Sequence, residues 1–379
     1  MKNKLLFPVL TLAAVLLAGV LLIGRYGIRR ADDAAVAENT PAPTQTVELP
    51  KAEEAKKEKP SPTPAPTPEP TPEPTPKPLR EPELRESELD TDLFLPAEHQ
   101  GTVSLVKYIT RDYVSDEHYD IEKDLAVYLP YGYDESEQYD VLILLHCAWA
   151  DHRFWLAEER DYRTLDGNIP VLVPNLLDNM IEEGYCRPTI VVSPCVYLYD
   201  RQPSVAGTAY EYAQFTHEVG KDLLPYIAEN YATYAADGSR GALRDAREHF
   251  GFLGASYGAY AEYLSVIGDN FDLAAWYTFC GGGAIEPGTL MNKWAQNGTA
   301  DLPLRLLLVS EGEYDDRQPP ELSVMQLHIY GGKFTEENVV FRLVPGWGHE
   351  DHIYLVGLFN TLQLFFRETE GIHGEDITG

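Results

Sequence analysis

A serine between two glycines is the residue of this chain best suited to covalent chemistry. Gly254-Ala255-Ser256-Tyr257-Gly258 matches G-x-S-x-G, the motif in which a sharp strand-to-helix turn exposes a nucleophilic hydroxyl. The apolar run 249–253 before it is typical of a strand, and residues 259–266 after it are typical of a helix. Glycines are needed because side chains two positions from the serine would collide with the strand or the helix. This context predicts that Ser256 is a nucleophile.

A serine hydroxyl attacks an acyl group only when a base takes its proton, and that base is most often a histidine oriented by a carboxylate. His349 follows a Gly-Trp-Gly turn and is the expected base, with His352 as its rival. Four carboxylates lie within residues 311–316, of which Asp315 is the preferred acid and Asp316 the alternative. The order serine, acid, histidine along the chain is that of α/β-hydrolases.

Acyl transfer also needs two backbone N–H groups directed at the oxyanion of the tetrahedral intermediate. One is expected from Tyr257, the residue after the nucleophile. The other is expected from Cys147 or Ala148, in the loop after the apolar run 141–145. Backbone donors carry no sequence signature, so this placement depends on analogy with the fold.

Apolar runs alternate with helical patterns, which predicts a mostly parallel sheet covered by helices on both faces, the α/β-hydrolase fold. Active sites of such sheets lie at the carboxyl ends of the strands. His146, Ser256, Asp315 and His349 each follow shortly after an apolar run, as this rule requires. The last helix is expected to be amphipathic. The expected strands are residues 103–109, 124–129, 141–145, 189–193, 249–253, 273–279, 304–309 and 339–343, and the expected helices are residues 175–183, 215–230, 259–266 and 352–367.

Three segments of different composition make up the chain. Residues 1–30 contain the uncharged 19-residue stretch 5–23, with Lys residues before it and Arg residues after it. They are expected to be a signal peptide or a membrane anchor, a choice that the sequence leaves open. Residues 31–90 hold 14 of the 28 prolines and are expected to be a disordered linker rich in Pro, Thr and Glu. Residues 91–379 have the length of one catalytic domain. The expected location is extracellular or at the cell surface, in a bacterial envelope, with membrane contact only through the N-terminal segment.

The chain carries 60 acidic residues against 30 Lys and Arg, a formal net charge of −30 at pH 7. Such a charge repels nucleic acid but permits an uncharged polymer as a substrate. Neither C-x-x-C nor H-E-x-x-H occurs, so neither a metal nor another cofactor is expected. The four cysteines are expected to be free thiols, with a Cys186–Cys195 disulfide as the alternative. The oligomeric state stays open.

Several stretches, in the right order, resemble the esterase D-like group of α/β-hydrolases, which includes the feruloyl and acetylxylan esterases of carbohydrate esterase family one. The resemblance covers about residues 101–368. The stretches that carry it are residues 127–134, 139–146 and 175–181, Gly184, Pro188, and residues 190–192, 346–349 and 357–360.

This resemblance implies hydrolysis of feruloyl or acetyl esters of plant cell-wall xylan through an acyl-enzyme on Ser256. His349 would act as base and then as acid, and Asp315 would orient it. The partner would be an acylated polysaccharide or oligosaccharide. The alternatives are a non-catalytic surface module that binds carbohydrate, or an acyltransferase or peptidase of related fold. The group also contains formylglutathione hydrolases and mycolyl transferases.

Three aromatic residues depart from the family pattern, one of them Tyr257 of the elbow, where methionine is common. Trp149 stands where the family is commonly rich in glycine and is expected to narrow or cap the acyl pocket, and Tyr354 stands where tryptophan is frequent. The Tyr-rich segment 197–212 is expected either to bind a sugar or ferulate ring or to be a surface insertion. Residues 285–297, with Trp294, are expected to form a lid. The residues expected to contact the substrate are Trp149, Tyr199, Tyr210, Trp347 and Tyr354.

Overall fold

The computed structural model describes residues 77–115, 118–164, 167–198, 208–282, 286–316 and 333–367. The chain divides into two units, Met1–Glu69 and Pro70–Gly379, and every described residue belongs to the second. The predicted signal or anchor segment lies outside the described residues. Within the described ranges, no helix combines the length and the apolar character that crossing a bilayer requires.

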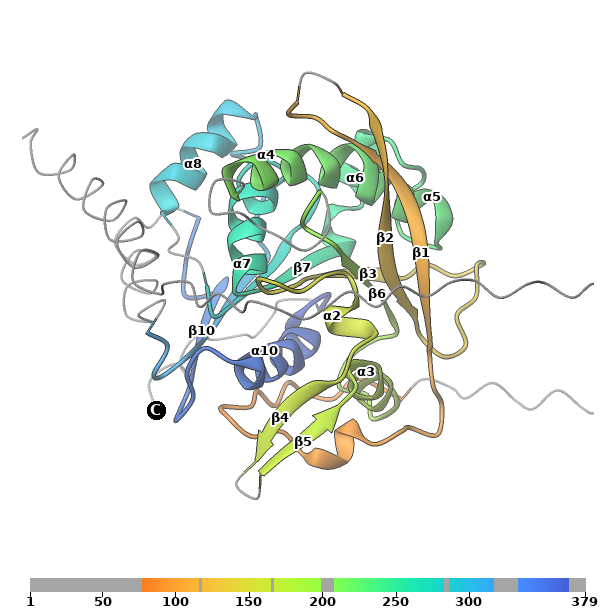
Figure 1. The fold of residues 1–379 in the computed structure, drawn as a ribbon, viewed down its shortest axis with the longest axis vertical. Helices are drawn as coiled ribbons and strands as arrows, with labels where there is room; N and C mark the ends of the chain where they lie inside the picture. Colours follow the sequence, from red (N-terminus) through yellow and green to blue (C-terminus); the bar gives the residue numbers. More distant parts are fainter. Residues whose placement is uncertain are drawn as a thin grey trace, which may run out of the picture. The chain divides into compact units, whose positions relative to one another are not determined.

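An eight-stranded sheet forms the centre of this unit (Figure 1). The two pairs at one edge, β1–β2 and β2–β6, are antiparallel, and all other pairs are parallel. The prediction of a mostly parallel sheet is thereby confirmed. In spatial order the strands are β1 (Thr102–Arg111), β2 (Asp120–Leu129), β6 (Thr189–Pro194), β3 (Asp140–Leu145), β7 (Phe250–Ala255), β8 (Trp276–Cys280), β9 (Leu306–Gly312) and β10 (Val339–Val344).

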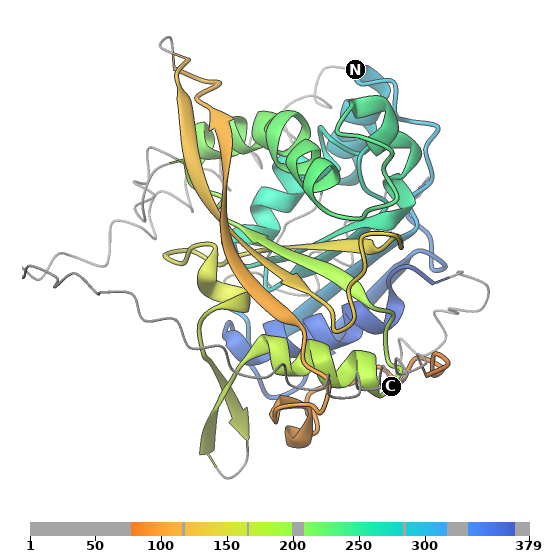
Figure 2. The same ribbon diagram turned by 90° about the vertical axis from the view of Figure 1, so that its right-hand side faces the viewer.

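The central strands are apolar on both faces because both faces of the sheet are covered. In β3, Val141 and Ile143 belong to one core cluster, whereas Leu142 and Leu144 belong to the other. Figures 1 and 2 show the two helical layers that enclose these clusters. The first cluster is covered by α4 (Thr208–Glu218), α5 (Leu224–Asn230), α6 (Arg240–Asp245), α7 (Tyr257–Ala261) and α8 (Pro287–Gln296), and the second by α2 (Arg153–Leu156), α3 (Val173–Glu182), α10 (Asp351–Leu364) and the hairpin β4 (Arg160–Thr164)–β5 (Gly167–Val171).

The helix expected at residues 215–230 is interrupted. A π-helical turn, Val219–Leu223, separates α4 from α5, and Pro225 lies in the first turn of α5. A proline is tolerated there because the first N–H groups of a helix have no intrahelical acceptor. The interruption therefore coincides with the proline.

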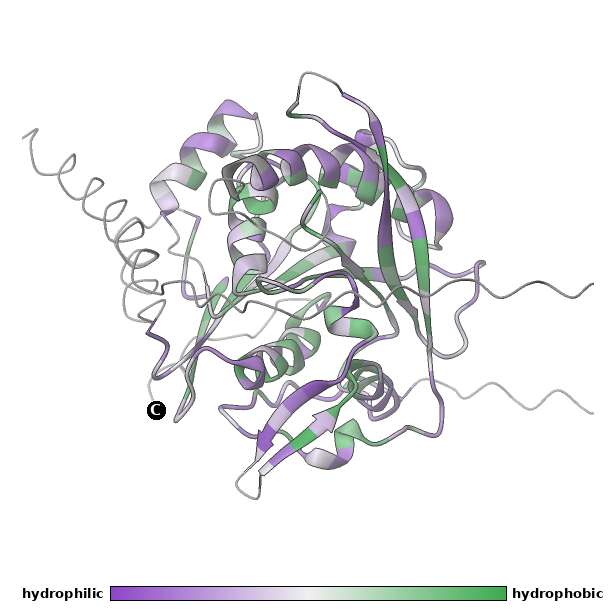
Figure 3. Ribbon diagram, in the orientation of Figure 1, coloured by the Kyte–Doolittle hydropathy of each residue, from purple (hydrophilic) through white to green (hydrophobic). Residues whose placement is uncertain are grey.

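The last helix, α10, is buried on all sides and is not amphipathic as predicted, since all its residues except Asp351 are buried. Figure 3 accordingly colours much of α10 as hydrophobic. The reason is the segment before β1, which covers the outer face of the helix. Asn360 exchanges two hydrogen bonds with the backbone of Arg85, both of 2.8 Å, and Gln363 exchanges two with Glu83, of 2.8 and 3.0 Å.

The same contacts place the start of the folded domain earlier than the predicted end of the linker at residue 90. Arg80 N–H donates to the Gly184 carbonyl at 2.8 Å, and the side chains of Leu89, Leu93 and Phe94 are buried in the second core cluster. Residues 77–90 are therefore part of the domain. The composition of residues 77–90 does not predict a folded segment, because most side chains there are charged or polar and few are apolar.

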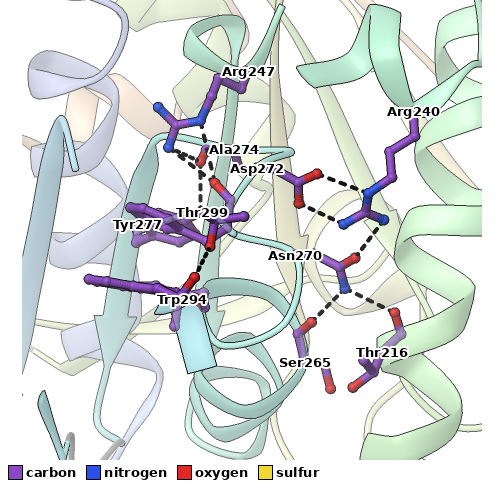
Figure 4. A network of polar contacts seen from close by, with 12 residues as sticks. Thr216, Arg240, Arg247, Ser265, Asn270, Asp272, Ala274, Tyr277, Trp294 and Thr299 are labelled. Atoms are coloured by element: carbon purple, nitrogen blue, oxygen red, sulfur yellow. Dashed lines mark hydrogen bonds and ion pairs between the residues drawn. The ribbon is translucent and has the colours of Figure 1, made fainter. Parts of the chain in front are cut away.

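Buried polar contacts fix the loop between the helix after Ser256 and β8 (Figure 4). The Arg247 guanidinium donates to the Ala274 carbonyl at 2.8 Å, and Arg240 donates twice to Asp272, at 2.6 and 2.9 Å. The Asn270 amide donates to two further carbonyls, at 2.7 and 2.9 Å. Each contact satisfies backbone or carboxylate oxygens that would otherwise be buried without a partner.

Trp294, expected in a lid, is a core residue. Its side chain has no exposed area and stacks on Phe271 with ring centroids 4.1 Å apart. Its indole N–H donates to the Ile267 carbonyl at 2.6 Å. The lid hypothesis is therefore wrong for this residue, which anchors α8 to the segment 267–271 before β8 (Figure 4).

Candidate active site

Ser256 lies in a strained turn between β7 and α7, with φ 52° and ψ −109°. Such a conformation is uncommon for a residue other than glycine and occurs mostly at functional sites. Its N–H donates to the Cys280 carbonyl at 2.8 Å, which fixes the turn to β8. A Cβ at Gly258 would approach the Leu145 carbonyl oxygen to 2.5 Å, and one at Gly254 would collide with the backbone of Gly258. The two glycines of the motif are thus sterically required.

The structure brings together the three residues predicted for the catalytic chemistry. The Ser256 hydroxyl donates to His349 Nε2 at 2.7 Å, and His349 Nδ1–H donates to Asp315 Oδ2 at 2.8 Å. The Asp315 carboxylate has no exposed area, and the His349 side chain is 8% exposed. Asp316 is exposed, so Asp315 is the carboxylate that meets the imidazole. This arrangement leaves the lone pair of Nε2 directed at the serine proton.

The loops after β9 and β10 hold the acid and the histidine against each other. The Tyr314 N–H donates to the Trp347 carbonyl at 2.8 Å, and the Glu313 carboxylate accepts from the Gly346 N–H at 2.8 Å. A Cβ at Gly312 would lie 2.5 Å from the Gly348 carbonyl oxygen. The close approach at Gly312 requires a small residue at the end of β9, and the positive φ of Gly346, 80°, favours glycine in the turn before His349.

His352, the rival base, has a structural role. Its ring stacks between Trp347 and Tyr162, with centroid distances of 3.7 and 4.6 Å, and its Nε2 bonds the Ser87 carbonyl. Burial lowers its pKa. Trp347, predicted to contact the substrate, therefore packs on His352 and supports the histidine turn.

His146 shapes the loop predicted to supply an oxyanion donor. The ring is fully buried, its Nδ1–H donates to the Cys147 carbonyl at 2.8 Å, and its Nε2 accepts from the Val196 N–H at 2.9 Å. Burial lowers the pKa of His146 to about 4, so the ring is neutral at pH 7. The loop lies against the start of α7, since a Cβ at Gly258 would lie 2.8 Å from the His146 carbonyl oxygen. The donor roles of the N–H groups of Tyr257, Cys147 and Ala148 stay predictions.

The side chain of Tyr257 is held by contacts that the sequence did not predict. Its ring lies between Tyr197 and Tyr212, each with a centroid distance of 5.2 Å, and its hydroxyl donates to Glu211 at 2.8 Å. Burial raises the pKa of Glu211. The described part of the Tyr-rich segment thus supports the residue after the nucleophile. Tyr199 and the side chain of Tyr210 lie outside the described part.

Tyr354 and Trp149 differ in their environment. Tyr354 is buried and lies edge-on to His349 with a centroid distance of 6.0 Å. Burial is the main cause that raises its pKa. The Trp149 side chain is 67% exposed, and its role in narrowing or capping the acyl pocket stays a prediction.

The four cysteines are free, as the sequence favoured, and the Cys186–Cys195 disulfide does not form. In the part of the chain that the structure describes, Glu98, His99 and Glu182 are the one group of His, Cys or carboxylate side chains close enough to share a metal ion. Their ligand atoms lie within 4.8 Å of one another. None of the three takes part in the Ser–His–Asp contacts.

Comparisons with known proteins find similar proteins both by sequence and by fold. No protein-family model matches the chain. The endo-1,4-beta-xylanase Y of Acetivibrio thermocellus is 25% identical over 262 residues, which are 65% of this chain and 22% of that protein. The chain therefore spans about a fifth of the length of the curated relative that it matches.

Solved structures show the same fold. A mutant of the feruloyl esterase module from Clostridium thermocellum, complexed with sinapinate, has a TM-score of 0.57 at 18% identity and covers 78% of this chain and 98% of its own. The CE1 ferulic acid esterase of the anaerobic fungus Anaeromyces mucronatus has a TM-score of 0.54 at 18% identity, over 76% and 98% of the two chains. The described domain therefore has the α/β-hydrolase fold of CE1 feruloyl esterases, as its sequence motifs predicted.

Proposed function

We propose that this protein is a serine esterase that hydrolyses acyl esters, feruloyl or acetyl, on plant cell-wall polysaccharide. The observation that carries the proposal is the pair of hydrogen bonds from Ser256 to His349 and from His349 to Asp315. The names of the xylanase relative and of the solved feruloyl esterases support the substrate class. The net charge of −30 is compatible with an uncharged polymer.

The geometry supports a two-step reaction. In the first step Ser256 Oγ attacks the ester carbonyl carbon while His349 Nε2 takes the hydroxyl proton. The oxyanion is stabilised by the N–H of Tyr257 and by an N–H of Cys147 or Ala148. The C–O bond to the sugar then breaks, and the sugar oxygen takes the proton from His349, which leaves an acyl-enzyme.

In the second step water replaces the sugar. The water oxygen attacks the acyl carbonyl while His349 takes a proton from the water. His349 then returns a proton to Ser256 Oγ as the carboxylic acid leaves. Asp315 keeps Nδ1 protonated and stabilises the imidazolium that forms in both steps. The enzyme is regenerated with no net change in protons bound.

The proposal includes export through the N-terminal segment, because a polysaccharide of the plant cell wall lies outside the cell that degrades it. The uncharged run in residues 1–30 supports this. Fractionation of cells that express the full chain tests it, with recovery of the protein in the cytoplasmic fraction as the contrary outcome.

A direct assay tests the reaction. Purified protein is expected to release p-nitrophenol from a short acyl ester and ferulate or acetate from acylated xylo-oligosaccharides, and Ser256→Ala is expected to lower kcat by roughly 10³-fold or more. Turnover that persists in Ser256→Ala contradicts the mechanism. Binding of glycan without turnover in the wild type would favour the non-catalytic alternative.

A further inference from the structure

Two exposed aromatic side chains lie next to the residues of the proposed active site. Trp149 and Tyr314 are each 67% exposed, more than any other large hydrophobic side chain that the structure describes. Trp149 is in the loop after β3 that is expected to supply an oxyanion donor, and Tyr314 directly precedes Asp315. Exposed aromatic rings next to a proposed nucleophile and its acid are available to contact a substrate.

The strand order places these two residues on opposite sides of the nucleophile. Ser256 follows β7, which pairs with β3 on one side and with β8 on the other, and β9 follows β8. Because these strands are parallel, their carboxyl ends share one edge of the sheet. At about 4.8 Å between strands, the ends of β3 and β9 lie roughly 14 Å apart. That span suits several linked sugar rings rather than one acyl group.

The backbone under each ring is held in place. Trp149 has φ 67°, which is unusual for a residue other than glycine, and its N–H donates to the Tyr197 hydroxyl at 3.1 Å. Tyr197 is itself buried and packs on Tyr257. The Tyr314 N–H donates to the Trp347 carbonyl at 2.8 Å. An aromatic ring on a fixed backbone loses little conformational freedom when it binds a ligand.

We propose that Trp149 and Tyr314 form a binding platform for the uncharged glycan chain that carries the ester, with one ring on each side of Ser256. The faces of the two rings stack on the apolar C–H faces of sugar units. The excess of acidic residues in the chain disfavours an anionic polymer. This inference rests on the proposed esterase function and assigns the residues that recognise the polymer.

The test compares a polymeric with a small substrate. We expect Trp149→Ala and Tyr314→Ala to lower the ratio of kcat/KM on feruloylated arabinoxylan to kcat/KM on methyl ferulate by about tenfold or more, through a higher KM on the polymer. Trp149→Phe and Tyr314→Phe should restore most of the ratio, because both keep an aromatic face. Thermal unfolding of each variant verifies that it is folded.

Tyr131→Ala is the matched control. Tyr131 is 51% exposed and follows β2, which runs antiparallel to its neighbour β6, so it lies at the edge of the sheet opposite to Ser256. Its substitution should leave the activity on both substrates unchanged. An unchanged ratio in the Trp149 and Tyr314 variants, or an equal fall in the Tyr131 variant, overturns the platform.

A binding experiment separates failure of the platform from failure of the esterase function. Affinity electrophoresis in soluble, unacylated xylan needs no turnover. The full chain with Ser256→Ala is expected to be retarded, and the added Trp149→Ala or Tyr314→Ala should remove the retardation. If the wild type hydrolyses neither ester but is retarded in this way, the esterase function fails and the platform stands. No retardation of the parent protein overturns the platform, whatever its esterase activity.

Discussion

Asp315 accepts a hydrogen bond from His349 at 2.8 Å although the two residues follow different strands, β9 and β10. The contact depends on the parallel pairing of these strands, which brings their carboxyl ends to one edge. Because the carboxylate has no exposed area, water does not compete for the imidazole. The imidazole is therefore held in the tautomer that can accept the serine proton.

The first prediction tests whether Asp315, and not the neighbouring Asp316, is the acid that orients His349. Asp315→Asn is expected to lower kcat on a short acyl ester by roughly 10³- to 10⁴-fold, because the amide stabilises the wrong tautomer and no imidazolium. Asp316→Asn, next to it but exposed, should retain activity near that of the wild type. Steady-state kinetics of both variants check this. Comparable losses in the two would show that the carboxylate of Asp315 has no special role.

The second prediction concerns the glycine after the nucleophile. Gly258→Ala brings a Cβ to 2.5 Å from the Leu145 carbonyl oxygen, so α7 and the loop with His146 must separate. We expect a loss of about 1–3 kcal/mol in the free energy of unfolding, together with a large fall in kcat, since both expected oxyanion donors shift.

Gly241→Ala is the control for this substitution. Gly241 lies in α6, and apart from its own helix backbone and chain neighbours nothing lies within 4 Å of the position of its added Cβ. Alanine there should stabilise the helix by about 0.5–1 kcal/mol. Denaturant unfolding and ester hydrolysis check both variants. A Gly258→Ala protein as stable and as active as the wild type would contradict the steric argument.

The sequence was sufficient for those parts of the fold and site that depend on local pattern. The buried strands β3, β6 and β7 are continuous apolar runs, and the elbow around Ser256 and the turn before His349 are marked by glycines. The hairpin β4–β5 was missed because it is short and mostly polar, and it is stabilised by the burial of Tyr162 and Val171.

Contacts between distant segments could not be predicted. Glu211 meets the Tyr257 hydroxyl across 46 residues, and Asn360 meets Arg85 across 275. Neither pair has a spacing or composition that marks it. The outer face of α10 is buried through the contact of Asn360 with Arg85. Because the sequence does not reveal this contact, the helix was predicted to have an exposed face. Trp294 was misplaced for the same reason, because its partner Phe271 lies in the loop before β8.

The third prediction concerns residues 77–90. Removing them exposes the outer face of α10 and leaves the amides of Asn360 and Gln363 without their backbone partners. A protein that begins at residue 91 is therefore expected to unfold at a lower temperature than one that begins at residue 70. Asn360→Ala in the longer protein should lower the free energy of unfolding by about 0.5–1.5 kcal/mol, because the partly buried N–H and carbonyl of Arg85 lose their side-chain partner.

Lys77→Ala is the control for this segment. Lys77 pairs with Glu183 at 3.2 Å, but its side chain is 55% exposed, and such pairs contribute at most about 1 kcal/mol. Its loss should hardly change the melting temperature. Equal stability of the proteins that begin at residues 70 and 91 would show that the segment is dispensable.

The last prediction is a pH dependence of stability that His146 causes. Burial holds its pKa at about 4, below the value of about 6.5 in an unfolded chain. Between these two pH values the unfolded state binds a proton that the folded state does not. The contribution of His146 to the free energy of unfolding is therefore complete above about pH 6.5 and is lost as the pH falls towards 4. The difference in pKa corresponds to about 3 kcal/mol.

His146→Gln cannot titrate, so its free energy of unfolding should fall less between pH 6.5 and 4 than that of the wild type. Urea unfolding across this range measures how the free energy of unfolding of each protein changes with pH. An equal change in the two proteins would mean that the imidazole is protonated inside the fold. That outcome would contradict the structure, in which the His146 Nε2 accepts a hydrogen bond from the Val196 N–H.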